Sequence, residues 1–288
     1  MRPELIELVV RHSKEVAPRP TSVRARLPVL EGLRAVVFDI YGTLMVSGTG
    51  DISLADAGDQ DELLFDVLRD FGLEPEPDVS PASCYLQCIQ KEHARRKEEG
   101  ISFPEVEIRE IWKELLSFCQ GSEVGPERLE ELALIYECRI NPVWPMPGFV
   151  EVMNDLNSRR LKLGIVSNAQ FYTPALFPAL TGRSLSQWGV DSALCVWSFE
   201  EREGKPSRNL FRKCAAALAK EGIQPGEALF VGNDYRKDVE ASAAVGFRTA
   251  LFAGDTRSLR PRDYEDDGVP DAILTDLRQI PVLLGAER

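Results

Sequence analysis

The sequence has little histidine and lacks the closely spaced cysteine pairs that bind zinc. Its two histidines are His12 and His93, and none of its six cysteines forms a C-x-x-C pair. Structural zinc sites are built from such paired ligands, so we expect none here. A chain of 288 residues also builds a core without disulfide bridges, and we expect its cysteines to be reduced thiols.

The sequence has fewer basic than acidic residues, and it has no long apolar run. The 34 Lys and Arg residues face 46 Asp and Glu residues, which gives a formal net charge of −12. Nucleic acids and anionic membranes bind clustered basic side chains, so we expect neither as a partner. No apolar run is long enough for a signal peptide or a membrane span. We therefore expect a soluble, cytoplasmic protein. The oligomeric state stays open.

Short apolar runs alternate with helical patterns over most of the chain. Strands are predicted at 35–38, 161–166, 193–197, 228–231, 248–252 and 272–274, and helices at 148–160, 174–180, 207–221 and 237–245. Such alternation is typical of a parallel sheet with helices on both faces. The predicted fold class is therefore α/β, with a doubly wound, Rossmann-like sheet as the core.

A long helical block separates the first predicted strand from the second. Helices are predicted around 63–71, 84–98, 104–116 and 127–140, with no strand alternation among them. Pro104 stands at a favourable helix-start position. His93 lies in a charged helical stretch and is predicted to be on the surface. A loop or small hairpin is predicted at 46–51, before the block.

These patterns divide the chain into three parts. Residues 1–33 form an N-terminal extension that begins with an amphipathic helix over 1–16. Residues 34–50 and 142–288 form the α/β core. Residues 51–141 form an all-helical insertion, whose length suits a small domain of its own.

Polar residues follow each of the first four core strands. In a parallel sheet the carboxyl ends of all strands meet at one edge, where open α/β folds bind their ligands. The residues expected at this edge are Asp39 after the first strand, Ser167 and Asn168 after the second, Lys205 after the third, and Asp234 and Asp238 after the fourth. Together they would supply a nucleophile, a hydroxyl, a cation and two further acids.

Four motifs in this set occur in a characteristic order over residues 34–252. They are Asp39-x-Tyr41-Gly42-Thr43, Ser167-Asn168, Gly204-Lys205-Pro206 and Gly232-Asn233-Asp234-x-x-x-Asp238. The constellation resembles the haloacid dehalogenase-like hydrolase superfamily. The helical block falls where that superfamily places its C1-type cap, which closes over the substrate and sets specificity.

The resemblance implies a role for each of these residues. Asp39 would be the covalent nucleophile. The residues that hold the anionic centre of the substrate would be Thr43, Ser167, Asn168 and Lys205. Magnesium would be bound by Asp39, by the backbone carbonyl of Tyr41 and by Asp234 or Asp238, and the sequence leaves open which of the two aspartates is the direct ligand.

Elementary electrostatics agrees with a metal at such a site. Two carboxylates such as Asp39 and Asp234 would repel a phosphate, at a cost of about 4 kcal/mol for each pair of unit charges at an effective dielectric constant near 20. A divalent cation reverses the sign of this interaction, and oxygen ligands suit magnesium. Lys205 supplies further positive charge.

Tyr41 decides between two reactions. Phosphatases of the superfamily usually carry a second Asp at this position, which protonates the leaving alkoxide, and a tyrosine with a pKa near 10 is a poor substitute. Displacing a halide from carbon needs no such proton, and the superfamily's 2-haloacid dehalogenases carry Tyr there. The segment ending in Asp238 is closer to the metal-binding, phosphatase-like form. The halide-binding Trp-Arg segment of the dehalogenases is missing, and Arg69 is the available stand-in.

Three hypotheses about function result. The first is a magnesium-dependent hydrolase of the phosphatase type that acts on a small phosphorylated metabolite, with Asp39, Tyr41, Ser167, Asn168 and Lys205 at its catalytic centre. The second is a metal-independent 2-haloacid dehalogenase. The third is a non-catalytic binding or regulatory protein on the same fold, which the retention of these polar residues disfavours.

Overall fold

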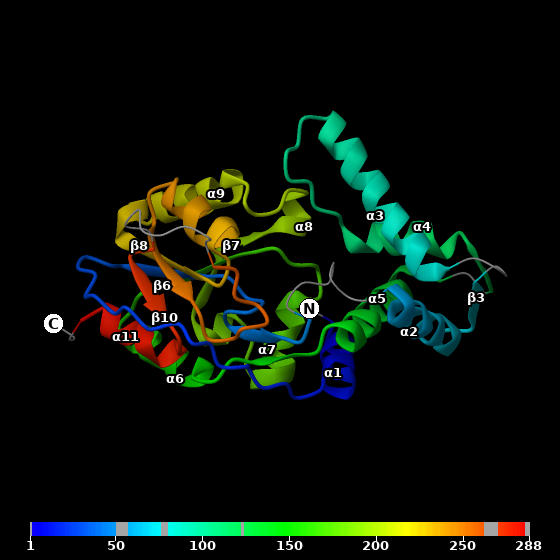
Figure 1. Ribbon diagram of the computed structural model, residues 1–288, viewed down its shortest axis with the longest axis horizontal. Coiled ribbons are helices and arrows are strands. Elements are labelled where there is room, and N and C mark those ends of the chain that lie inside the picture. Colours follow the sequence, from blue (N-terminus) through cyan, green and yellow to red (C-terminus); the bar gives the residue numbers. More distant parts are fainter. Residues whose placement is uncertain (1, 50–56, 76–79, 122–123, 262–269, 286–288) are drawn as a thin grey trace.

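The computed structural model describes residues 2–49, 57–75, 80–121, 124–261 and 270–285. It contains an α/β core and a group of helices that extends from one end of it (Figure 1). The core sheet has six strands in the order β10-β9-β8-β1-β6-β7, and every neighbouring pair is parallel. The strands are β1 (Ala35–Phe38), β6 (Lys162–Ser167), β7 (Val190–Trp197), β8 (Ala228–Gly232), β9 (Arg248–Phe252) and β10 (Ala272–Leu274).

Helices cover both faces of the sheet. Along β1, Val36 and Phe38 belong to the apolar cluster that contains residues of α6 (Phe149–Ser158) and α7 (Thr173–Thr181). Ala35 and Val37 belong to the cluster that contains residues of α9 (Arg208–Lys220). This alternation follows from the period of two residues in a strand, and it explains why β1 is apolar throughout. The predicted doubly wound α/β fold is confirmed.

The remaining elements of the core are short or lie between strands. They are α6 (Phe149–Ser158), α7 (Thr173–Thr181), η2 (Ser186–Trp188), α8 (Ser198–Glu201), α9 (Arg208–Lys220), η3 (Pro225–Glu227), η4 (Tyr235–Glu240), α10 (Ala241–Ala243), η5 (Leu277–Gln279) and α11 (Ile280–Leu283). The single helix predicted at 237–245 is instead a π-helical turn followed by a short α-helix. The turn begins at Asp234, whose side chain accepts a hydrogen bond from the backbone N–H of Lys237 at 2.8 Å.

The helical block enters and leaves the core through a pair of short strands. β2 (Met45–Ser47) pairs antiparallel with β5 (Val143–Pro145), so the two connections lie side by side. The prediction of a loop or small hairpin at 46–51 is therefore wrong for Val46 and Ser47, because they pair with residues beyond the insertion, and Gly48 and Thr49 follow as a bend. The last residues of that stretch lie outside the described residues.

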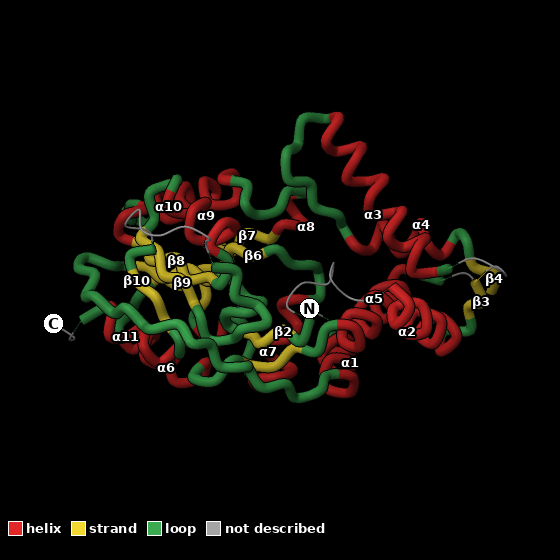
Figure 2. Tube along the Cα trace, viewed as in Figure 1, coloured by secondary structure: helices red, strands yellow, loops and turns green. Residues whose placement is uncertain are grey.

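The block itself holds α2 (Ala57–Asp70), α3 (Pro81–Glu98), α4 (Ile108–Leu116) and α5 (Pro126–Ile140). Figure 2 shows that it also holds two short strands, β3 (Leu73–Pro75) and β4 (Cys119–Gly121), which pair antiparallel. The block is thus helical but not all-helical, and three-residue strands are too short to show a period in the sequence.

The predicted helix start at Pro104 is also wrong. The backbone before α4 pairs with the core, because Phe103 accepts a hydrogen bond from Gly204 N–H at 2.8 Å and Glu105 N–H donates to Arg202 at 3.1 Å. Glu107 then caps the helix through its side chain, which accepts from Arg109 N–H. The segment between α3 and α4 therefore docks on the loop that carries Lys205.

The N-terminal extension contacts both parts of the molecule. Its helix α1 (Pro3–His12) packs against α5 of the insertion and α7 of the core. Arg2 forms ion pairs with Glu130 and Glu131 at 3.1 Å each. Among the described residues, no helix combines the length and the hydropathy that a membrane crossing requires.

Trp112 is at the centre of the packing of the inserted helices. It is fully buried, and its ring lies 5.4 Å from the rings of Tyr85 and of Tyr136. We expect Trp112→Ala to lower the free energy of unfolding by about 3–5 kcal/mol, because it removes the largest side chain of this core. Trp112→Phe should cost less than about 1.5 kcal/mol, since no described residue accepts a hydrogen bond from the indole N–H.

Urea denaturation followed by circular dichroism measures both changes. The matched control is Phe118→Ala, because Phe118 follows the same helix but is 43% exposed. Its effect should stay within about 0.5 kcal/mol of the wild type. Equal losses for Trp112→Ala and Phe118→Ala would contradict the described packing.

Candidate active site

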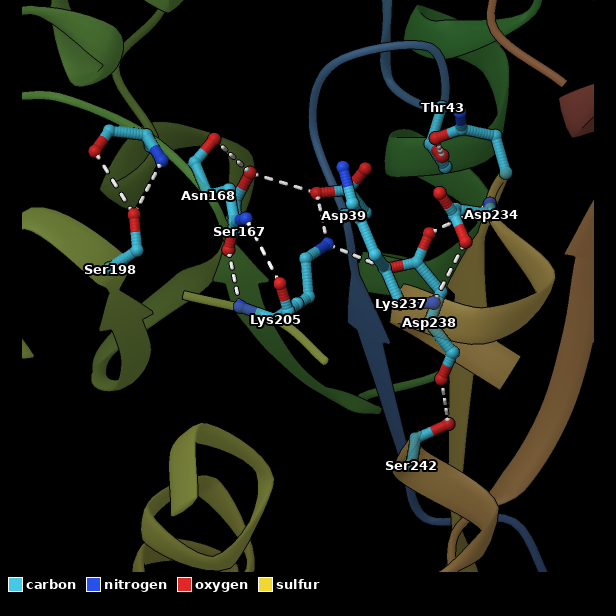
Figure 3. A network of polar contacts seen from close by, with 12 residues as sticks. Asp39, Thr43, Ser167, Asn168, Ser198, Lys205, Asp234, Lys237, Asp238 and Ser242 are labelled. Atoms are coloured by element: carbon cyan, nitrogen blue, oxygen red, sulfur yellow. Dashed lines mark hydrogen bonds and ion pairs between the residues drawn. The ribbon is translucent and has the colours of Figure 1, made fainter. Parts of the chain in front are cut away.

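A buried lysine bridges two aspartates at the carboxyl edge of the sheet (Figure 3). Lys205 Nζ lies 2.7 Å from Asp39 Oδ1 and 2.6 Å from Asp238 Oδ1. Ser167 Oγ donates a hydrogen bond to the same Asp39 oxygen at 2.8 Å. All four side chains are buried. The structure thus brings together four residues that the sequence places after four different strands.

The charges of this group depend on one another. Burial alone would lower the pKa of Lys205, but the neighbouring Asp238 and Asp39 outweigh it, so the pKa is raised and the ammonium stays protonated. Burial raises the pKa of Asp238 to about 6, against the opposing effect of Lys205. One cation therefore serves two carboxylates, and the group keeps a net negative charge when both are ionised.

Asn168 holds the backbone that carries Lys205. Its Oδ1 accepts a hydrogen bond from Lys205 N–H at 2.7 Å, and its Nδ2 donates to the Lys205 carbonyl at 3.4 Å. The Lys205–Pro206 peptide bond is cis. Asn168 therefore acts in this structure on the position of Lys205, and it also lines the adjacent cavity.

Thr43 lies behind the site rather than in it. Its side chain is fully buried, and its hydroxyl donates to Asn233 Oδ1 at 3.1 Å. In this structure the Thr43 hydroxyl is directed to Asn233, and its contact with the substrate phosphate stays a prediction. Its neighbour Gly42 has φ +83°, and a Cβ there would lie 2.5 Å from Ser258 Cβ. The turn after Asp39 is therefore packed against the loop after β9 and needs glycine.

Asp238 and Asp234 differ in the number of carboxylate oxygens that already have a partner. Asp238 contacts Lys205 through Oδ1 and accepts from Asp234 N–H through Oδ2 at 2.9 Å, so each of its oxygens already has a partner. Asp234 caps the π-helical turn through Oδ1 alone and lines the cavity. Within the described residues, no three His, Cys, Asp or Glu side chains gather into a metal site by themselves.

Tyr41 faces the same cavity but its hydroxyl is engaged. It lies 2.9 Å from Thr173 Oγ1. Burial, followed by the charge of Glu137, raises the pKa of Tyr41 well above its usual value. The hydroxyl is therefore a weaker acid than free tyrosine, and it is not poised to exchange a proton near neutral pH.

A cavity of about 550 Å³ lies between the sheet edge and the inserted helices. Its lining on the core side includes Asp39, Tyr41, Asn168, Lys205 and Asp234, and on the other side Tyr85, His93, Glu105, Tyr136 and Glu137. The prediction of a surface position for His93 is wrong, because His93 is half-buried and its Nε2 has no hydrogen-bond partner among the described residues.

The side chains of the insertion that line the cavity belong to none of the four sequence motifs. One feature of the sequence distinguishes Glu137: it is the single acid within the apolar stretch 132–138. Glu105 has no such feature, because its position depends on the docking of the α3–α4 connection: it accepts from Ser198 Oγ at 3.0 Å. Spatial convergence of this kind has no local pattern.

A family model described as haloacid dehalogenase-like hydrolase matches residues 33–246. Phosphoserine phosphatase from Thermus thermophilus is 31% identical over 174 residues, which are 59% of this chain and 62% of that protein, so less than two thirds of its length is covered. Glyceraldehyde 3-phosphate phosphatase from Methanopyrus kandleri is 24% identical over 83% of this chain and 91% of that protein.

Solved structures share the fold. A 2-haloacid dehalogenase from Pseudomonas syringae pv. Tomato superposes with a TM-score of 0.57 at 17% identity, covering 88% of this chain and 98% of that one. A HAD phosphatase from Thermococcus onnurineus gives 0.56 at 20% identity, covering 89% and 100%. The family model covers most of the chain, including Asp39, Ser167, Lys205 and Asp238, and the chain therefore belongs to the haloacid dehalogenase-like hydrolases.

Proposed function

We propose that this hydrolase is a magnesium-dependent phosphatase of small phosphorylated metabolites. The observation that carries the proposal is Asp39 at the floor of a cavity, held by Ser167 and Lys205 and followed along the sheet edge by Asp234. The cavity volume of about 550 Å³ suits a small metabolite. Curated relatives named as phosphatases add support.

The residues present fit a magnesium ion at this edge. Magnesium is usually bound in proteins by one or two carboxylates together with substrate phosphate oxygens. Asp39 and Asp234 each keep one carboxylate oxygen that no described residue hydrogen-bonds. We infer that these two carboxylates hold the ion with the Tyr41 carbonyl, and that Asp238 instead holds Lys205. When bound, the ion would neutralise charge on the phosphoryl group.

The reaction proceeds in two displacements at phosphorus. A carboxylate oxygen of Asp39 attacks the phosphorus atom, the bond to the alcohol oxygen breaks, and an aspartyl phosphate forms. Water then attacks that phosphorus, so that the carboxylate and inorganic phosphate are released. Lys205 and Ser167 stabilise the phosphoryl oxygens and keep Asp39 in place. Tyr41 offers no ready proton for the departing alkoxide, so leaving-group basicity limits the rate.

We further propose that residues 51–141 act as one cap over this cavity, with 34–50 and 142–288 as the catalytic core and 1–33 as an extension. The docking of the α3–α4 connection on the Lys205 loop supports this division. Arg202 of the core also binds Glu110 of α4 through both carboxylate oxygens.

Dehalogenation is the second candidate, and Tyr41 is the observation that favours it. A halide leaves carbon without a proton, so an unreactive tyrosine is no obstacle. Under this alternative Asp39 attacks carbon, and Lys205 needs no metal beside it. The free carboxylate oxygen of Asp234 at the cavity has no purpose in that reaction, and we therefore place phosphate hydrolysis first.

The nucleophile is tested with Asp39→Asn. We expect magnesium-dependent hydrolysis of p-nitrophenyl phosphate by the wild type and a loss of at least about 1,000-fold in kcat for the variant, because an amide cannot form the covalent intermediate. The absorbance of released nitrophenolate measures both. Asp234→Asn should instead raise the magnesium concentration needed for half-maximal rate. Wild-type protein that is inactive with magnesium would contradict the phosphatase proposal.

The lack of an acid that protonates the leaving alkoxide is tested with Tyr41→Asp. This change should raise kcat for an alkyl phosphate by about 10- to 100-fold and change the rate for an aryl phosphate much less, because only the alkoxide needs protonation. Released phosphate is measured for both substrates. The matched control, Tyr41→Phe, also removes the hydrogen bond to Thr173 but adds no acid, and it should show no such gain. A similar gain in both variants would argue against the protonation argument.

Dehalogenation is tested directly with 2-chloropropionate. We expect no chloride release above the uncatalysed rate when a chelator removes divalent cations, as measured with a chloride electrode. Asp39→Asn serves as the blank. Chloride release by the wild type that survives chelation and disappears in this variant would make the second candidate the better one.

A further inference from the structure

The part of the cavity formed by the inserted helices has a chemistry of its own. Glu137 of α5 lines it, together with the tyrosines Tyr85, Tyr136 and Tyr172. Tyr85 and Tyr136 meet edge to face with ring centroids 5.6 Å apart. A carboxylate therefore stands among aromatic rings, in the region that receives whatever is attached to a phosphate held at Asp39.

Glu137 has hydrogen bonds but no cation. Asn141 Nδ2 donates to its Oε1 at 3.3 Å, and the Tyr172 hydroxyl also donates to the carboxylate. No Lys, Arg or His among the described residues forms an ion pair with it.

The other acids of the cavity are differently placed. Asp39 and Asp238 share Lys205. Glu105 accepts hydrogen bonds from Ser198 Oγ and from the backbone N–H of Val106, and the charge of Lys237 acts on it as well. Asp234 caps the π-helical turn at the sheet edge, beside Asp39, and is assigned above to the magnesium ion. On the side of the cavity formed by the insertion, Glu137 is thus the carboxylate that no cation of the described residues pairs.

An unpaired carboxylate in a half-buried position is costly. Burial raises the pKa of Glu137, which is the sign of an acid that lacks a compensating charge. A ligand that fills the cavity would displace water from the carboxylate and increase that cost, unless the ligand itself brings a cation. The surrounding tyrosine rings also favour a cation, because their faces carry negative charge density.

We propose that Glu137 and the tyrosines around it bind an ammonium group on the alcohol part of the substrate, so that the substrates are phosphomonoesters of amino alcohols. The assignment rests on the proposed phosphatase function and narrows its substrate class. The phosphate would occupy the core side at Asp39, and the amine the opposite side at Glu137. A hydroxyl group bound to Glu137 is the competing occupant.

The experiment compares two substrates that differ in one group. O-Phosphoethanolamine carries an ammonium where 2-hydroxyethyl phosphate carries a hydroxyl. We expect the wild type to show kcat/KM at least about tenfold higher for the amine, since a charge-assisted hydrogen bond contributes about that factor. In Glu137→Gln the ratio of the two kcat/KM values should fall to near one. Glu98→Gln, at an exposed position of α3, is the matched control and should keep the wild-type ratio.

The outcomes distinguish the amine assignment from the proposed phosphatase function. A wild-type ratio near one, or a ratio unchanged by Glu137→Gln, overturns the amine assignment. Equal losses on both substrates also overturn it, because they would make Glu137 a general acid or a structural residue. Hydrolysis of p-nitrophenyl phosphate together with a ratio near one leaves the phosphatase function intact. If nothing is hydrolysed, titration calorimetry on Asp39→Asn with both ligands still decides, since tighter binding of the amine is expected and equal binding refutes it.

Discussion

The ion contacts of Lys205 are the interaction on which the rest of the site depends. A lysine buried between Asp39 and Asp238 is stable only because both carboxylates compensate the loss of its hydration. Removing either acid would leave Lys205 with a single carboxylate partner at the sheet edge. The same arrangement commits Asp238 to Lys205 and leaves Asp234 with an oxygen toward the cavity. The different contacts of the three aspartates thus follow from the position of the Lys205 ammonium.

The insertion forms the wall of the cavity that lies opposite Asp39. The strand pair β2–β5 brings its two connections together, and the α3–α4 connection docks on the loop that carries Lys205. Side chains of α3 and α5 then form the far wall of a cavity whose floor is Asp39. Charge on that wall is therefore held at a defined position relative to the nucleophile. This placement makes Glu137 a candidate for substrate recognition rather than a surface acid.

Prediction from sequence succeeded where the signal was local. The run Ala35–Phe38 was expected to be a buried strand and is one, and 248–252 was predicted with its observed bounds. Asp39, Ser167 and Lys205 were expected at one edge and are in contact there. Errors arose where pairing partners are distant: Met45–Ser47 binds a strand beyond the insertion, and Pro104 precedes a segment that docks on the core instead of beginning a helix.

The sequence by itself determined the fold class, the family and the residues at the strand ends, because hydrophobic period and motif order are properties of neighbouring residues. Only the tertiary structure decided which partner each hydroxyl and carboxylate oxygen contacts. It turned Thr43 away from the cavity, bound both oxygens of Asp238, and set His93 and Glu137 into the cavity wall. The physical reason is that hydrogen bonds, ion pairs and burial depend on which elements meet in space, as when Lys205 contacts Asp238 and Thr43 contacts Asn233, and no local pattern records such contacts.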